Sequence, residues 1–176
     1  PVIEISGRSY PVSVEYLNEP TDLNSGIADA LDQILANKNS GARDVLVFLS
    51  GEREIFETAK FLRQLYQNQI EVLPLYSRLR VSDQEKIFTN KGSLRRVILA
   101  TNVAETSVTV PNIGYVVDPG LARVNRYSYR SKLERLPIEP ISKASAEQRK
   151  GRCGRIAPGT CYRLYDEADF LTRVFL

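Results

Sequence analysis

The feature that most constrains the fold of this sequence is a series of short apolar runs separated by segments with helical periodicity. Each run has four to six residues, the length of a strand buried on both faces of a sheet; the runs are 45–49, 70–75, 96–100, 114–117 and 161–165. Strands that alternate with helices predict an α/β fold with an open, mostly parallel sheet and helices on both faces. The connections between parallel strands are expected to be right-handed.

Between these runs, apolar residues recur every three or four positions, which predicts amphipathic helices. Two such sets are clear: Ile27, Ala30, Leu31, Ile34 and Leu35, and then Ile55, Ala59, Leu62 and Tyr66. Ser82 and Glu85 have the spacing of a capping box and predict the start of a short helix that carries Phe88. Residues 143–155 predict a last helix that ends near Pro158.

Two segments depart from this alternation. Residues 12–16 alternate apolar and polar side chains, and we interpret residues 1–24 as a strand and linker that lead in from an absent domain, with residues 25–176 forming the domain itself. The sequence begins without Met, which suggests an excised fragment. Residues 127–135 are basic and alternate, which predicts a β-hairpin that projects from the sheet over about residues 123–139.

Composition excludes several classes of protein. The chain has 176 residues and no histidine, so a His-ligated metal site, a Ser-His triad and a His general base are excluded. The two cysteines, Cys153 and Cys161, do not have zinc-site spacing, and we interpret them as reduced thiols of a cytoplasmic protein. No apolar run is long enough to span a membrane. The net charge of +3 is too small to indicate a nucleic-acid partner by itself, but residues 123–135 carry five basic side chains against one acidic.

The segment 148–155 (QRKGRCGR) is the most informative. On a helix, Gln148, Arg152 and Arg155 would form one stripe with an amide and two guanidinium groups, which grip phosphate oxygens well. Gly151 and Gly154 each weaken a helix by about 1 kcal/mol, which suggests that a phosphate or another domain approaches the backbone. The alternative is a solvated basic helix end, with Gln148 completing a capping box that starts at Ser145.

The segment 101–109 follows a predicted buried strand and carries five hydroxyl or amide side chains. Loops at the carboxyl ends of strands are where open α/β sheets bind ligands, so these side chains are candidates for holding phosphate, water or a nucleic-acid backbone. The alternative is an ordinary strand-to-helix turn that Thr or Asn caps.

Together these segments resemble motifs of a known family. Residues 101–107 (TNVAETS) and 148–155 resemble motifs V and VI of DEAH-box helicases of superfamily 2, and residues 46–55 (LVFLSGEREI) resemble motif IV. Residues 73–79 (LPLYSRL) and 116–123 (VVDPGLAR) resemble the segments after motifs IV and V. Motif IV and residues 126–130 (RYSYR) most resemble the sequences of bacterial HrpA-type RNA helicases. The resemblance extends from about Ile5 to Phe170.

The resemblance is to the second RecA-like domain alone. No Gly-x-x-x-x-Gly-Lys-Ser/Thr loop and no Asp-Glu-Ala-His motif is present, and the family carries both on a preceding first RecA-like domain. The resemblance therefore implies ATP with Mg²⁺ held mainly by that absent domain. It also implies further C-terminal domains, and a fragment that is inactive alone.

The resemblance also assigns roles near the nucleotide. Arg152 and Arg155 would be arginine fingers that neutralise charge on the γ-phosphoryl group, with Gln148 orienting phosphate or water. Thr101, Asn102 and Ser107 would connect the nucleotide cleft with the RNA, and Phe88 would stack on adenine. The alternative for Phe88 is a core residue of a short helix.

For the RNA, the resemblance implies sequence-independent backbone contacts from Ser50, Gly51, Ser77, Arg78 and Thr106. It adds Arg126, Arg130 and Lys132 on the hairpin. The implied partner is single-stranded RNA or an RNA duplex with an overhang.

Two other functions stay open: a stand-alone RNA- or protein-binding module on the same scaffold, and a translocase on DNA instead of RNA, because backbone contacts do not distinguish the two nucleic acids.

Overall fold

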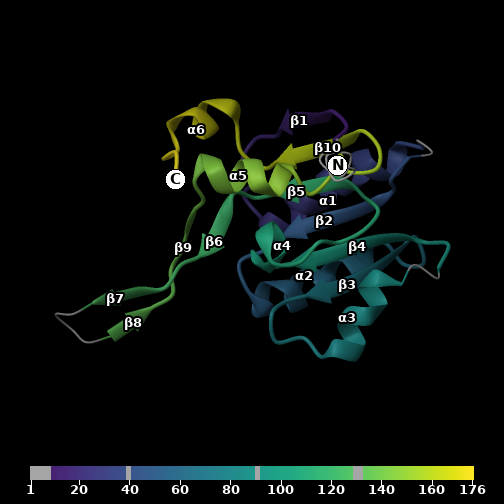
Figure 1. Cartoon of the computed structure of the whole chain (residues 1–176), viewed down its shortest axis with the longest axis horizontal. Helices are drawn as coiled ribbons and strands as arrows, with labels where there is room; N and C mark the ends of the chain where they lie inside the picture. Colours follow the sequence, from purple (N-terminus) through teal and green to yellow (C-terminus); the bar gives the residue numbers. More distant parts are fainter. Residues whose placement is uncertain (1–8, 39–40, 90–91, 129–132) are drawn as a thin grey trace, which may run out of the picture.

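The computed structural model describes residues 9–38, 41–89, 92–128 and 133–176, and for 126–128 and 133–135 it describes the backbone alone. Its centre is a six-stranded sheet in the order β1-β10-β5-β2-β4-β3, in which all neighbouring strands run parallel (Figure 1). The strands are β1 (Val12–Tyr16), β2 (Asp44–Phe48), β3 (Ile70–Leu75), β4 (Arg95–Ala100), β5 (Ile113–Asp118) and β10 (Gly159–Arg163). The predicted open parallel sheet is confirmed.

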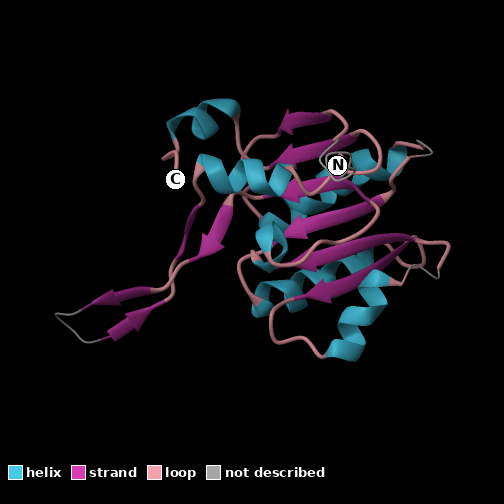
Figure 2. Ribbon diagram, in the orientation of Figure 1, coloured by secondary structure: helices cyan, strands magenta, loops and turns pink. Residues whose placement is uncertain are grey.

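Helices cover both faces of this sheet, as predicted (Figure 2). They are α1 (Leu23–Ala36), α2 (Glu52–Leu65), α3 (Val81–Phe88), α4 (Val103–Thr106), α5 (Lys143–Lys150) and α6 (Glu167–Thr172). Helices α1 and α2 share one core with Val45 and Val47, whereas α3 and α4 share the second core with Leu46 and Phe48. Alternate residues of β2 thus face opposite cores, and the strand is buried throughout because both faces are covered.

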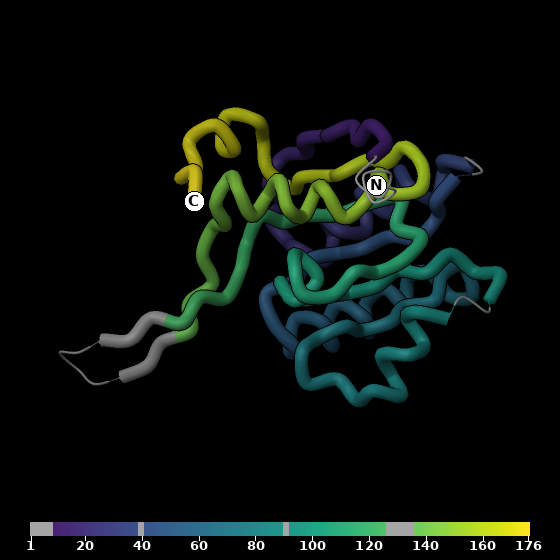
Figure 3. The backbone as a smooth tube through the Cα atoms, viewed as in Figure 1, coloured from purple at the N-terminus to yellow at the C-terminus, as the bar shows by residue number. Residues whose placement is uncertain are grey.

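The predicted hairpin is confirmed, and it is longer than predicted. Strand β6 (Leu121–Arg123) pairs antiparallel with β9 (Ile138–Pro140) at the root, and β7 (Arg126–Ser128) pairs with β8 (Leu133–Arg135) farther out. Figure 3 shows the chain leaving the carboxyl edge of the sheet after β5 and returning to α5. The hairpin is therefore rooted where the parallel strands end.

Three predictions about helix ends are wrong. Helix α3 begins at Val81 with no side-chain cap, so Ser82 lies inside the first turn and cannot cap it. Helix α5 begins after Ser142, whose Oγ accepts from the Ser145 amide at 3.1 Å, so Ser145 is not the cap. Helix α5 also ends at Lys150, and residues after it form turns and bends, so the helix predicted over 143–155 is five residues too long.

Helix α6 was not predicted. It is short and buries no residue completely, so it has no apolar face to reveal it. The Asp166 side chain starts it by accepting from the Asp169 amide at 2.8 Å. Arg173, just past its end, donates to the carbonyls of Gly120 and Ile141 and so fixes the helix to the hairpin root. Across the described part of the chain, no helix is long and apolar enough to cross a membrane.

Candidate functional site

The predicted polar residues gather at the carboxyl edge of three neighbouring strands. Ser50 and Gly51 follow β2, Ser77 follows β3, and Thr101 follows β4, and these strands are adjacent in the order β2-β4-β3. The Leu49 amide donates to the Ala100 carbonyl at 2.7 Å, which holds the first and third of these loops side by side. The topology therefore brings the implied backbone-contacting residues to one edge.

Arg78 lies at this edge but is already paired. Its guanidinium makes a bidentate ion pair with Glu52 in the first turn of α2, with Nε and Nη2 at 3.0 and 3.1 Å from the carboxylate oxygens. This hydrogen bond raises the pKa of Arg78. Because the Arg78 side chain is 79% exposed, the pair contributes little to stability and an incoming phosphate can displace Glu52.

The loop after β4 presents its polar groups to solvent. Asn102 is the N-cap residue of α4, but its side chain makes no capping hydrogen bond, and Asn102, Thr106 and Ser107 are all exposed. Thr101 is half-buried. Ordinary capping therefore does not account for the Asn102 side chain, which remains available to a ligand.

The predicted stripe of Gln148, Arg152 and Arg155 is wrong as a helical stripe, because α5 ends at Lys150. Instead the chain turns, and Arg152 Nε donates back to the Gln148 carbonyl at 3.2 Å. Gln148 and Arg155 are exposed and Arg152 is half-buried. The structure therefore keeps Arg152 next to Gln148 by a local contact.

The two arginines have no carboxylate partner among the described residues. Burial and the positive charge of Arg155 lower the pKa of Arg152, against the opposing effect of Glu105. Two neighbouring guanidinium groups without a counter-ion repel each other, and an anion bound between them relieves that repulsion. The arrangement is compatible with binding of a phosphate group.

The reason for glycine at positions 151 and 154 differs from the predicted one. At Gly154, with φ of 78°, the amide of Tyr10 donates to the carbonyl at 2.7 Å, and a Cβ would lie 2.5 Å from Val12 Cγ2. At Gly151 a Cβ would meet nothing nearer than 3.4 Å. The close approach is therefore made by the chain's own segment before β1, not by a phosphate or another domain. It also places Gly154 near the amino end of β1, whereas Ser50 and Thr101 follow the carboxyl ends of β2 and β4.

Phe88, the last residue of α3, is 45% exposed, so the alternative that it is a core residue is wrong. Ile87 occupies the core position instead. The buried guanidinium of Arg96 donates to the Ile87 carbonyl and so fixes the backbone at the end of α3, from which the Phe88 side chain extends. An aromatic ring held at the surface in this way is available for stacking.

Sequence reasoning missed the most buried charged group of the site. Arg149 is completely buried, with Nε 2.7 Å from Glu105 Oε1 and Nη1 2.8 Å from Asp118 Oδ1. Burial alone lowers the pKa of Arg149, but the two carboxylates outweigh it and raise the pKa. The one signal in the sequence is Asp118, an acidic residue at the end of an otherwise apolar strand, which needs a cation when it is buried.

The structure gives no side-chain position for three predicted site residues of the hairpin. Arg130 and Lys132 are outside the described residues, and for Arg126 only the backbone is described.

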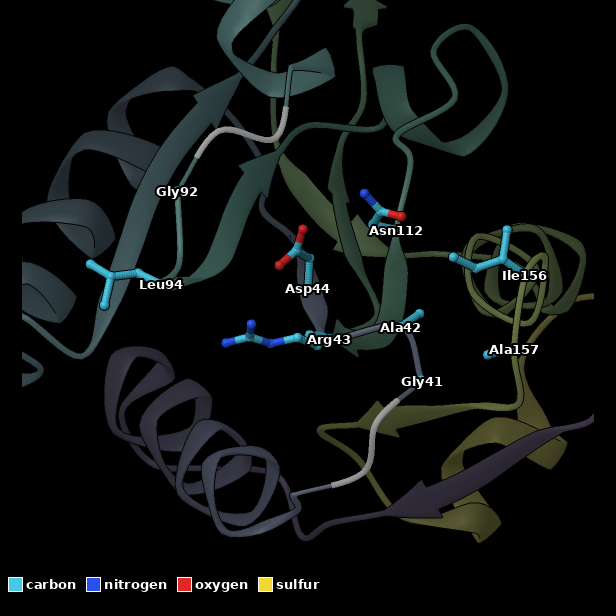
Figure 4. A pocket seen from close by; sticks show the side chains of 9 residues that line it. All are labelled: Gly41, Ala42, Arg43, Asp44, Gly92, Leu94, Asn112, Ile156 and Ala157. Atoms are coloured by element: carbon cyan, nitrogen blue, oxygen red, sulfur yellow. The ribbon is translucent and has the colours of Figure 1, made fainter.

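Two cavities differ in their relation to the site. One of about 360 Å³ lies at the amino ends of β2, β4 and β5 and is lined by residues that include Arg43, Asp44 and Asn112 (Figure 4). It contains none of the predicted site residues. The other, of about 460 Å³, lies between α4 and the hairpin root and includes Asn102 and Arg123. Among the described residues, no group of three or more His, Cys, Asp or Glu is placed to hold a metal.

Comparison with known proteins agrees with this geometry. The family model described as "Helicase conserved C-terminal domain" matches residues 26–157. The chain is 54% identical to the ATP-dependent RNA helicase HrpA homolog of Haemophilus influenzae and 55% identical to HrpA of Escherichia coli, over 98% of its length in each case. It is 43% identical to the probable ATP-dependent RNA helicase DHX34 of mouse over 97% of its length. It spans only 13%, 14% and 16% of these relatives.

The solved structures give the same answer. A crystal structure of the Escherichia coli DExH-box NTPase HrpB superimposes with a TM-score of 0.86 at 36% identity, covering 96% of this chain and 21% of that one. The resemblance drawn from the motifs is thereby confirmed. The chain belongs to the family of helicase conserved C-terminal domains, as a second RecA-like domain of a DEAH-box helicase of HrpA type.

Proposed function

We propose that this chain is the C-terminal RecA-like half of an ATP-dependent RNA helicase. In this proposal it closes on ATP bound by a first RecA-like domain, supplies Arg152 and Arg155 as arginine fingers, and forms part of the RNA track. Similarity to proteins named ATP-dependent RNA helicases over nearly the whole chain supports it. The domain boundary proposed is the one expected from the sequence, with residues 1–24 leading in and 25–176 forming the domain.

The observation that carries the proposal is the pair of guanidinium groups of Arg152 and Arg155, of which Arg152 bonds the Gln148 carbonyl. Arg152 and Arg155 act on each other electrostatically and have no carboxylate partner among the described residues, so their positive charge is available to a γ-phosphoryl group. Arginine fingers in related enzymes contribute about 10³-fold or more to turnover. Phe88, exposed at the end of α3, is proposed to stack on adenine.

RNA is proposed to follow the carboxyl edge of the sheet. Ser50, Gly51, Ser77 and Thr106 offer hydroxyl and amide groups there, and Arg78 exchanges Glu52 for phosphate. Such contacts are independent of sequence and weaken with salt. Thr101 and Asn102 precede α4 and Ser107 follows it, and these three are proposed to connect the RNA edge with the nucleotide. Arg126, Arg130 and Lys132 are proposed to extend the track along the hairpin.

Mg²⁺ is proposed to be held by the first RecA-like domain, since the residues described here offer no cluster of metal ligands. Both thiols, Cys153 and Cys161, are free and buried, which supports a reducing compartment and hence the cytoplasm.

The test is ATP turnover by a full-length helicase that carries this domain. Arg152→Ala is expected to lower RNA-stimulated turnover by about 10³-fold while RNA affinity stays within about twofold. Lys60→Ala is the control, because Lys60 is an exposed cation of α2 that lies outside residues 46–55 and outside the proposed site. Turnover that survives Arg152→Ala would favour the binding module instead. Competition between matched RNA and DNA strands distinguishes an RNA from a DNA translocase.

A further inference from the structure

One buried side chain contacts four separate elements around the proposed site. The guanidinium of Arg149, on α5, bonds Glu105 on α4 at 2.7 Å and Asp118 at the end of β5 at 2.8 Å. It also donates to the Leu121 carbonyl, at the first residue of β6, at 3.1 Å. Its centre lies 4.7 Å from the ring of Phe48, the last residue of β2. Each of the three guanidinium nitrogens therefore donates a hydrogen bond, and the Phe48 ring packs against the group.

Stability alone does not account for such a group. Removing a guanidinium and two carboxylates from water is costly, and well-packed apolar residues in place of a buried ion pair often give equal or greater stability. What the ionic arrangement adds is geometry, because a planar fork with five donors fixes the direction of each partner. We therefore ask which parts of the site this geometry positions.

Three of the four partners of Arg149 border a group proposed to contact RNA, and the fourth, Asp118, ends β5 at the same edge of the sheet. Glu105 precedes Thr106, Phe48 lies two residues before Ser50, and Leu121 begins the hairpin.

Along the chain, Arg149 follows Gln148 on α5 and lies three residues before Arg152, which comes just after this helix; both neighbours are proposed to contact ATP. Arg152 is in turn bonded to the Gln148 carbonyl. One rigid side chain thus joins the RNA edge to the nucleotide segment.

We propose that Arg149 is a positioning residue that couples RNA binding at the carboxyl edge to ATP binding at Gln148 and Arg152. The inference rests on the proposed function and adds the residue through which the two ligands affect each other. Energetic coupling between two sites is reciprocal, so it can be measured from binding alone. The quantity to measure is the factor by which a non-hydrolysable ATP analogue with Mg²⁺ changes the Kd of the full-length helicase for a single-stranded RNA.

The informative variant is Arg149→Lys. Lysine keeps the charge that neutralises Asp118 and Glu105, but its single ammonium cannot bond both carboxylates and the Leu121 carbonyl in fixed directions. The wild-type protein is expected to show a coupling factor of about fivefold or more, the usual range for linked sites. Arg149→Lys is expected to bring this factor close to one.

Two further variants complete the test. Glu105→Gln weakens the contact to α4 while Arg149 keeps Asp118, so it is expected to reduce the factor even if Arg149→Lys does not fold. Glu147→Gln is the matched control: Glu147 also joins α5 to a buried guanidinium, that of Arg163, but Arg163 lies on β10 and not on β2, β3 or β4, whose loops carry the proposed RNA contacts. It is expected to keep the wild-type factor.

The proposal is overturned if the wild-type factor is one, or if a folded Arg149→Lys or Glu105→Gln variant keeps the wild-type factor. Its failure is distinct from failure of the proposed function. Loss of turnover in Arg152→Ala with unchanged coupling in Arg149→Lys would overturn this inference alone.

Discussion

Replacing Arg149 by Met is the sharpest prediction about what holds this domain together. Asp118 is completely buried and the Glu105 side chain is 11% exposed, so Arg149→Met leaves two carboxylates without their cation in the core. Breaking a buried ion pair by removing one partner costs about 3–5 kcal/mol. In a domain of this size each kcal/mol lowers Tm by about 2–4 °C, so we expect a fall of about 6–20 °C.

The assay is thermal and urea unfolding of the 176-residue chain, followed by circular dichroism. Adding Asp118→Asn and Glu105→Gln to Arg149→Met is expected to recover more than half of the loss, because no uncompensated charge then remains buried. Arg53→Met, at an exposed position, is expected to change stability by no more than about 0.5 kcal/mol. A loss below about 1 kcal/mol for Arg149→Met, or a further loss on adding the two neutral variants, would refute the reasoning.

Other predictions concern the segment around α5. Gly154→Ala is expected to cost at least about 1 kcal/mol in urea unfolding, since φ is 78° and the Cβ would clash, whereas Gly151→Ala is expected to be neutral or stabilising. Burial raises the pKa of the Cys153 thiol to about 11 and that of Cys161 as well, so at about pH 8 neither should react with a disulfide reagent until the chain is unfolded. Burial by itself raises the pKa of Glu147, but hydrogen bonds and charges from Arg163 and Lys150 lower it below 4.5. The stability that Glu147 contributes is therefore present above that pH and is lost as the pH falls further. Glu147→Gln should flatten this part of the profile of unfolding free energy against pH.

The sheet was predictable because its information is local. A parallel strand covered on both faces must be apolar along its length, and residues 45–49 show this in the sequence alone. Loops after such strands lie at one edge by topology, so the grouping of Ser50, Ser77 and Thr101 followed from strand order without any side-chain geometry.

What sequence reasoning missed depends on contacts between distant residues. Helix α5 ends at Lys150, and the turn after it brings Gly154 against the segment before β1, more than 140 residues away. Arg149 sits in a basic run that looks solvated, and its carboxylate partners lie 31 and 44 residues earlier in the chain. No periodicity shows that one cation of four in such a run is buried.

The same contacts connect fold to function. Because Arg149 is buried and paired while Arg152 and Arg155 have no carboxylate partner among the described residues, we propose different roles for neighbouring arginines of one motif. Arg149 would fix α5 against the sheet, and the positive charges of Arg152 and Arg155 would bind a ligand. Burial, not residue type, separates the two roles.

The most direct test of the central claim is a structure of a full-length helicase that carries this domain, with RNA, Mg²⁺ and a non-hydrolysable ATP analogue bound. The account predicts that the guanidinium groups of Arg152 and Arg155 both lie within about 3 Å of γ-phosphate oxygens, with Arg149 still bonded to its two carboxylates. Arginines 152 and 155 turned away from the nucleotide, or paired with protein carboxylates, would contradict it.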